Sequence, residues 1–247
     1  MSTTSNADLL FGIWPYAAVA IWAAGLVLRY LRALPRMDTV SAQLSESWAT
    51  FGSSKVLQGA LGILALGHLI ALVYPGAILS WNAGAMDRLY LLEGAGLLFG
   101  LIALGGWLRL LLRHLETRHP SLLGDLGDSI FVGLVLVGLV SGLATAVFYR
   151  WASSWAAATV MPYTLSLLSG SPEVAYVSPL PLALRIHVVS GFAALAAFPF
   201  TRLAPFLVVA LHRVFGVLGR PMATAGKLAE DFLRRHNPGV WIWPKED

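Results

Sequence analysis

Residues 54–74 read SKVLQGALGILALGHLIALVY, with one charged residue, Lys55, near the start and a histidine, His68, well inside. Such a run is long and apolar enough to cross the hydrocarbon core of a membrane as a helix, which takes about 20 residues. Similar runs occupy about 9–34, 89–112, 130–155 and 181–212. We therefore predict an all-α membrane protein, a bundle of five transmembrane helices.

The composition agrees with this fold class. Hydrophobic residues make up 57% of the 247 residues and charged residues 12%, about half the charged fraction of a soluble domain. No set of segments alternates polar and apolar residues as the strands of a membrane barrel do. There is no cysteine, which excludes covalently attached haem, iron–sulfur ligation within this chain and disulfides.

The basic residues predict the orientation of the bundle. Of the 17 Lys and Arg, Arg88, Arg150 and Arg185 alone fall in or near the loops of one side. Because cytoplasmic loops are enriched in Lys and Arg, we expect the N-terminus outside and the C-terminus inside. This distribution also accounts for the sequence pI of about 9.6 without a nucleic-acid partner.

Two segments depart from simple spans. The last apolar run is longer than a bilayer requires, so it tilts or its end projects from the membrane, and Pro199 and Pro205 are candidate kinks. Residues 156–178 are mildly apolar and contain several prolines, which favours an interfacial loop with a short helix over a sixth span. We assign residues 1–215 to the membrane domain and 216–247 to a cytoplasmic amphipathic tail. That tail either lies in the lipid interface or docks a cytoplasmic subunit.

His68 and His187 both lie inside predicted spans, on different helices. With a rise of 1.5 Å per residue, both rings are expected roughly 10–12 Å below the outer surface. Two neutral imidazoles at one depth are suited to axial ligation of a b-type haem, and Gly67 beside His68 leaves room for a flat macrocycle. Arg185 is placed to reach a propionate. The alternative is that the histidines form interhelical hydrogen bonds and the glycines allow close helix packing.

At these residues the chain resembles the gamma, cytochrome b, subunit of respiratory nitrate reductase and its relatives. The matching stretches are Phe11-Gly-Ile-Trp-Pro-Tyr16, Leu28-Arg-Tyr30, Gly62-Ile-Leu-Ala-Leu-Gly-His68, Arg185-Ile-His187-Val-Val-Ser-Gly191 and Phe198-Pro-Phe-Thr-Arg-Leu203.

The resemblance implies two b haems, the outer one held by His68 and His187. The positions that correspond to the inner ligands are Gln58 and Pro205. Neither is an ordinary haem ligand, so we predict one haem. A second haem on His212, with His114 as its partner, is the less favoured alternative.

The resemblance also implies the function: a membrane-anchoring, electron-transferring subunit in the prokaryotic inner membrane, between the quinone pool and the iron–sulfur and catalytic subunits of a hydrogenase or molybdenum enzyme. With no inner haem, the partner approaches from outside, or electrons reach an inner partner by another route.

The resemblance further implies that Arg88 binds quinone and that Arg202 contacts the cofactor. The alternative for Arg88 is an arginine that anchors the span at the membrane interface. Glu93 either relays quinone protons or pairs with Arg88. The competing functions are a haem-free membrane anchor and a small transporter, and the transporter is disfavoured because no internal repeat is evident.

Overall fold

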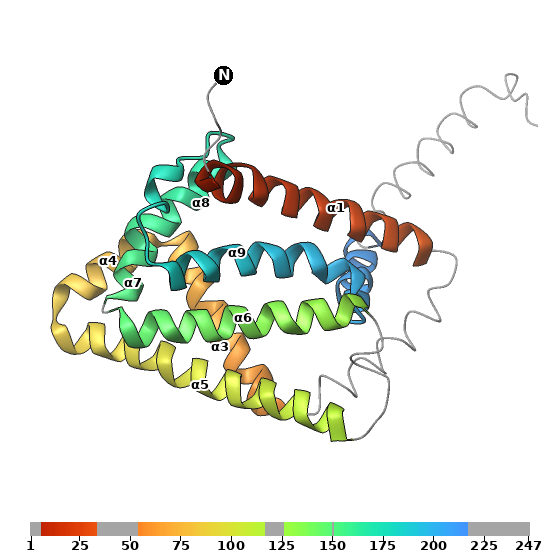
Figure 1. The fold of residues 1–247 in the computed structure, drawn as a ribbon, viewed down its shortest axis with the longest axis horizontal. Helices are drawn as coiled ribbons and strands as arrows, with labels where there is room; N and C mark the ends of the chain where they lie inside the picture. The colour runs from red at the N-terminus through yellow and green to blue at the C-terminus, as the bar shows by residue number, and fades with distance from the viewer. Residues whose placement is uncertain (1–5, 34–53, 117–125, 150, 217–247) are drawn as a thin grey trace, which may run out of the picture.

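The computed structural model describes residues 6–33, 54–116, 126–149 and 151–216, with the backbone alone for 113–116. Every regular element in these ranges is a helix (Figure 1). Five of the helices are long and apolar enough to span a membrane, which confirms the predicted fold class. The predicted tail, 216–247, lies almost entirely outside the described residues and stays a prediction.

The first span consists of η1 (Asp8–Ile13) and α1 (Trp14–Ala33). The others are α3 (Lys55–Val73), α5 (Met86–Glu116), α6 (Leu126–Phe148) and α9 (Leu182–Ala197), which is continued by η5 (Phe198–Phe200). Neighbouring helices pack in the order α1, α9, α6, α5, α3, so chain order is not spatial order. Large apolar side chains such as Leu66, Leu101 and Val140 remain exposed on the spans, as a lipid-facing surface requires.

The end of the bundle expected to face outward is covered by short helices. These are α4 (Pro75–Gly84), α7 (Ala152–Trp155), η3 (Ala156–Val160), α8 (Met161–Leu168) and η4 (Val174–Tyr176), all at the left of Figure 1. No span was predicted in 156–178 and none is found. The segment contains three helices, η3, α8 and η4, where a loop with one short helix was predicted. The sequence reading missed α4, because Pro75 was taken only as the stop of the preceding helix, whereas proline also fits the first turn of a new one.

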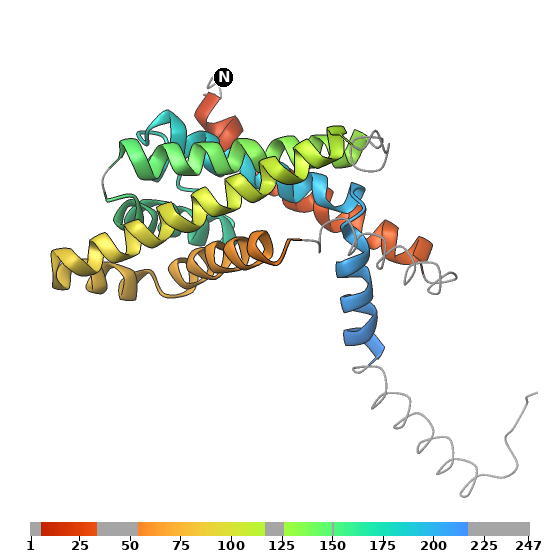
Figure 2. The ribbon, with the colours of Figure 1, turned by 90° about the horizontal axis from the view of Figure 1, so that it is seen from below.

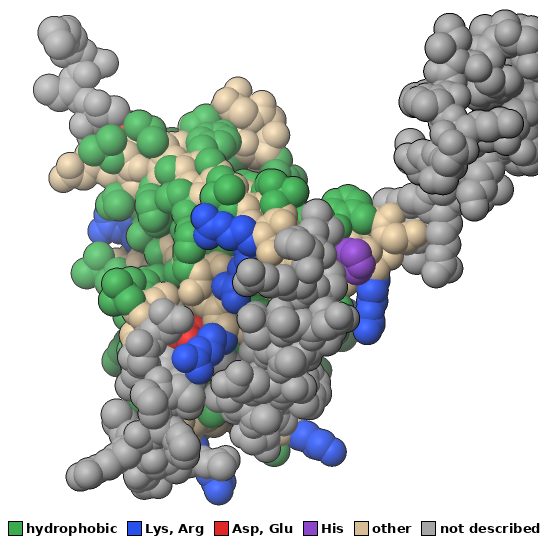
Figure 3. Space-filling view, turned by 90° about the vertical axis from the view of Figure 1, so that its right-hand side faces the viewer, with side chains coloured by type: hydrophobic (Ala, Val, Ile, Leu, Met, Phe, Trp, Pro, Cys, Tyr) green, Lys and Arg blue, Asp and Glu red, His purple; other side chains and the backbone are tan. Residues whose placement is uncertain are grey.

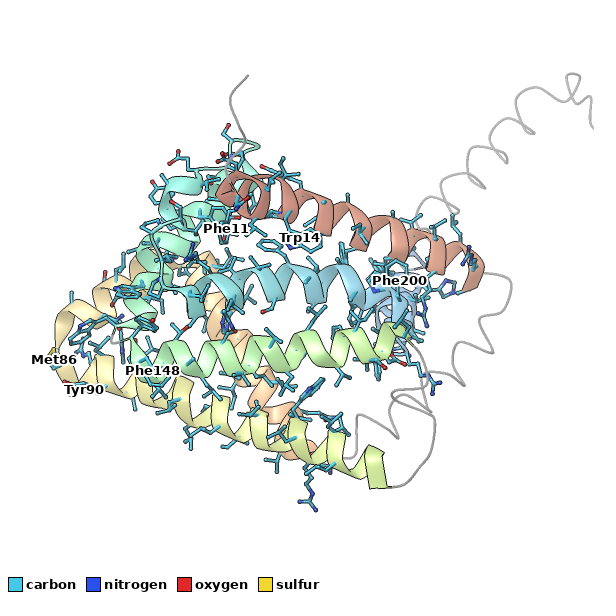
Figure 4. All side chains as sticks on the ribbon, in the orientation of Figure 1. Phe11, Trp14, Met86, Tyr90, Phe148 and Phe200 are labelled. Atoms are coloured by element: carbon cyan, nitrogen blue, oxygen red, sulfur yellow. The ribbon has the colours of Figure 1, made fainter. Side chains whose placement is uncertain are left out.

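This cover is tied to the start of the first span through tyrosine hydroxyls. Tyr163 is fully buried, and its hydroxyl donates to the Phe11 carbonyl at 2.6 Å. The rings of the same two residues meet edge to face, with centroids 6.2 Å apart, and Figure 4 labels Phe11 where the chain enters α1 beside α8. Burial raises the pKa of the Tyr163 phenol, so the hydroxyl stays a protonated donor at neutral pH. Tyr16 makes a second tie, donating to the Leu167 carbonyl at 2.8 Å.

At the opposite end the last apolar run is divided in two. The span stops at η5, and a separate helix, Ala204–Gly216, leaves the bundle at an angle (Figure 2). Pro199 and Pro205, the predicted kinks, flank the break and are buried. The end of the run is thus a separate helix, and whether it projects from the membrane stays a prediction. The end of the fourth span also differs from the prediction: α6 stops at Phe148 rather than near Trp155, and Trp151 has a left-handed backbone with φ of 70°.

The basic side chains gather at the end where the last helix leaves. Arg29, Lys55, Arg109, Arg202 and Arg213 belong to elements that begin or end there. Figure 3, which looks onto this end, shows Lys and Arg side chains around its rim. By the charge rule this end is the inner one, and the short helices cover the outer one.

Candidate functional site

The two histidines expected to form a ligand pair come together between α3 and α9. Their ring centroids are 5.9 Å apart and their planes are inclined by 33°. The two helices pack mainly on other neighbours, α3 on α5 and α9 on α6 and α1. The rings therefore face each other across a space that direct helix packing does not close.

Both rings are oriented by a hydrogen bond at Nδ1. His68 Nδ1 lies 2.7 Å from the carbonyl oxygen of Leu64 in its own helix, and His187 Nδ1 lies 2.8 Å from that of Gly138 in α6. A carbonyl accepts only, so in these bonds each Nδ1 carries the proton and donates. Each neutral imidazole then keeps the lone pair of Nε2 for a metal.

The separation of the rings fits axial ligation of one metal centre. An imidazole nitrogen binds a metal at about 2.0 Å, and the ring centroid lies about 1.1 Å behind that nitrogen, so two axial ligands place their centroids about 6.2 Å apart. The observed 5.9 Å differs from this by a few tenths of an ångström. His187 does form an interhelical hydrogen bond, from α9 to α6, as the alternative expects, whereas His68 bonds within its own helix. These bonds use Nδ1 and leave both Nε2 atoms for a metal.

The glycines near the two histidines lie in open positions. A Cβ added at Gly59, Gly62 or Gly67 would meet no atom within 4 Å, and the same holds at Gly191 on α9. Within the part of the chain that the structure describes, these glycines are therefore not packed against a neighbouring helix, contrary to the alternative in which they serve close helix packing. The imidazole pair fits a b-type haem, which needs two axial imidazoles and no cysteine.

The sequence reading missed two residues that hold His187, both in α6. Gly138 supplies the carbonyl that accepts from Nδ1. Gly142, one turn later, faces the ring so closely that an added Cβ would lie 3.0 Å from Cε1 and 3.1 Å from Nδ1. The available signal was the spacing of four between small residues in an otherwise bulky apolar helix, which indicates close approach of another group.

The two predicted arginines differ in position. Arg185 lies on α9 near the pair, and its Nε is buried without a hydrogen-bond partner. A buried cationic donor of this kind suits an anionic oxygen such as a propionate. Arg202 lies beyond the inner end of α9, where its Nε is 3.4 Å from Oδ2 of the buried Asp128. The structure does not bring Arg202 to the histidines, and its contact with the cofactor stays a prediction.

The residues predicted to bind quinone lie at the outer end of α5. The Arg88 guanidinium stacks over the Trp81 ring, 5.3 Å from its centroid. Glu93 does not pair with Arg88. Its Oε1 accepts from the Ser153 backbone N–H at 2.8 Å and from the Ser153 hydroxyl at 2.5 Å. Asn82 donates to that same hydroxyl oxygen at 3.0 Å, so α4, α5 and α7 meet in one polar chain that the sequence did not indicate.

The positions that correspond to the inner ligand pair hold no imidazole. Gln58 sits in the first turn of α3, and Pro205 is fully buried at the start of the last helix. His212, the possible substitute, has Nδ1 3.4 Å from the Tyr30 hydroxyl of α1. The side chain of His114 lies outside the described residues, as do His119 and His236.

Five apolar spans with two facing histidines between them define a multi-pass membrane protein of the kind that membrane cytochromes b exemplify. Comparison with known proteins gives the family. The family model described as nitrate reductase gamma subunit matches residues 7–218. The chain therefore belongs to the nitrate reductase gamma subunit family, whose members are haem b cytochromes of bacterial respiratory membranes.

Similar curated proteins are distant but cover most of the chain. The nitrate reductase gamma chain of Bacillus subtilis is 26% identical over 80% of this chain and 90% of its own length. The respiratory nitrate reductase 2 gamma chain of Escherichia coli is 25% identical over 79% of this chain and 90% of its own. The nitrate reductase-like protein NarX of Mycobacterium tuberculosis is 28% identical over 95% of this chain, which matches 36% of that longer protein.

Proposed function

We propose that this protein is the membrane-anchoring cytochrome b subunit of a respiratory oxidoreductase complex, with one b haem between His68 and His187. The observation that carries the proposal is the ring pair itself: centroids 5.9 Å apart, with each Nδ1 hydrogen-bonded to a carbonyl. When bound, the haem supplies reversible one-electron redox chemistry. The chain would hold the haem with the His68 and His187 rings, each oriented by a hydrogen bond at Nδ1, and Arg185, two residues before His187, would be available to a propionate.

The proposed electron donor or acceptor on the membrane side is quinone. Arg88 and Glu93 lie at the outer end of α5, the same side of the bundle as the two histidines according to the depths of their spans. A guanidinium can donate to a quinone carbonyl, and a carboxylate can take up the proton that is released when a quinol loses an electron.

The proposed partners are an iron–sulfur subunit and a catalytic subunit of the molybdenum or hydrogenase class. The family name and the gamma chains of Bacillus subtilis and Escherichia coli support a subunit of a larger complex. We propose one haem rather than two because Gln58 and Pro205 occupy the positions that would hold the inner pair. The substrate of the complex is left open by the same departure from the family pattern.

The test is an optical spectrum of the full chain purified with its bound subunits, together with haem quantified per chain. We expect a reduced-minus-oxidised α band of b type, one haem per chain, and loss of the band in both His68→Ala and His187→Ala. His212→Ala is the matched control, and it should keep the whole band.

The other outcomes are equally informative. A wild-type protein without the band is a haem-free anchor, and the proposal fails. Two haems per chain, with half of the band lost in His212→Ala, would overturn the single-haem assignment and assign His212 to a second site.

A further inference from the structure

His68 and His187 are held in different ways. The partner of His68 Nδ1 is the Leu64 carbonyl, one turn earlier on the same helix, so the ring and its acceptor move together with α3. The partner of His187 Nδ1 is the Gly138 carbonyl of a different helix, α6. The orientation of His187 therefore depends on how α6 sits against α9, the most extensively packed helix pair in the described structure.

Gly142 determines how closely the His187 ring can approach α6. Its missing side chain leaves space for the His187 ring, since a Cβ there would approach Cε1 to 3.0 Å and Nδ1 to 3.1 Å. Contacts of that length are tighter than nine in ten real Cβ contacts, so the ring has to shift by a few tenths of an ångström. A shift of the ring away from α6 lengthens the 2.8 Å hydrogen bond to Gly138.

We propose that Gly138 and Gly142 of α6 are positioning residues that set the orientation and electron donation of the His187 imidazole toward the haem iron, an inference that rests on the proposed function. An Nδ1–H bonded to a good acceptor makes the imidazole a more basic ligand, which stabilises the oxidised metal. Through this bond the α6 backbone would lower the midpoint potential of a bound haem.

Ser141 also approaches the Gly138 carbonyl oxygen, the acceptor of the His187 hydrogen bond. Its hydroxyl donates to the Val137 carbonyl at 2.6 Å and lies 3.1 Å from the Gly138 carbonyl as a second acceptor. This hydroxyl competes with His187 for the Gly138 oxygen. Removing it should strengthen the bond from Nδ1, which is the opposite of the effect expected at Gly142.

The main test is a redox titration of the α band in Gly142→Ala, with Gly133→Ala as the matched control. Both changes add one methyl group to a glycine of the same helix, but a Cβ at Gly133 meets nothing within 4 Å. We expect Gly142→Ala to shift the midpoint potential upward and to change the low-spin ferric electron paramagnetic resonance signal. Gly133→Ala should match the wild type in both measurements.

Ser141→Ala tests the proposal by a substitution that the fold should tolerate, in case Gly142→Ala does not accumulate. It should shift the midpoint potential downward with full haem content. An unchanged potential in Ser141→Ala, an unchanged potential and signal in Gly142→Ala, or equal shifts in Gly142→Ala and Gly133→Ala would overturn the proposal. Each of these results needs a haem-containing wild type, so they are distinct from failure of the proposed function, in which the wild type has no band.

Discussion

Glu93 has a structural role within its span and, in the proposed function, a chemical one as well. Its Oε1 accepts both the N–H and the hydroxyl of Ser153, so the carboxylate holds the start of α7 against α5. A glutamine would retain that acceptor oxygen but could not carry a proton. Glu93→Gln therefore separates the two roles.

If Glu93 relays quinone protons, Glu93→Gln should slow haem reduction by quinol about a hundredfold in isolated membranes, within the range of general acid–base catalysis. The haem content should remain that of the wild type because the hydrogen bonds to Ser153 are kept. The rate is measured by stopped-flow absorbance of the α band. A wild-type rate in Glu93→Gln would leave this carboxylate with the structural role alone.

At the scale of single residues, the sequence located the histidines but not what holds them. Both imidazoles lie in apolar runs, where an ionisable residue is conspicuous. Gly138, Gly142 and Ser153 could not be selected in the same way. Small residues are common in membrane helices, and a backbone carbonyl as a partner leaves no mark in the sequence.

Among the helices, the length of the apolar runs predicted the spans because the thickness and apolarity of a bilayer impose it. The predicted boundaries of the first three spans fall within a few residues of the observed ones. The outer cover was not predicted, because α4 and residues 152–168 are short helices whose formation depends on contacts such as Tyr163 with Phe11. The break after α9 was indicated by proline, but the direction of the helix after it depends on polar contacts from other spans.

The polar contacts that hold the helix after the break come from α1 and α6. Arg29 Nη1 donates to the carbonyls of Pro199 and Thr201 at 2.8 and 2.7 Å, and the Arg202 backbone N–H donates to Oδ1 of Asp128 at 2.8 Å. Asp128 is 2% exposed, so its carboxylate is committed to this end of the bundle. Together the two side chains hold the break in the last apolar run.

Removing one of these contacts should destabilise the inner end. Asp128→Ala leaves the buried N–H of Arg202 without its acceptor, and we expect a loss of about 1–3 kcal/mol. Asp128→Asn keeps an acceptor oxygen at the same place and should lose less. Thermal unfolding of the purified protein in detergent, followed by circular dichroism, gives the comparison. Equal melting temperatures for wild type and Asp128→Ala would show that this hydrogen bond does not hold the break.

For the whole molecule, the orientation in the membrane decides which compartment the short helices and the last helix face. The chain contains no cysteine, so single-cysteine variants can be labelled without background. Glu173 is exposed on the outer cover, and Arg213 is exposed on the helix that leaves the inner end. If the N-terminus is outside, a membrane-impermeant maleimide should label Glu173→Cys in intact spheroplasts. Arg213→Cys should react only after the membrane is opened.

The reverse labelling pattern would place the histidine pair near the inner surface instead. A single haem would then lie close to an inner iron–sulfur partner, and the long gap that a lone outer haem leaves would not exist. The pattern of Lys and Arg argues against this, because Arg29, Lys55, Arg109, Arg202 and Arg213 would then all have to face outward, against the bias that governs insertion. With the predicted orientation and the single haem proposed above, the partner collects or delivers electrons near the outer surface, or exchanges them with that haem by a route that does not use an inner haem.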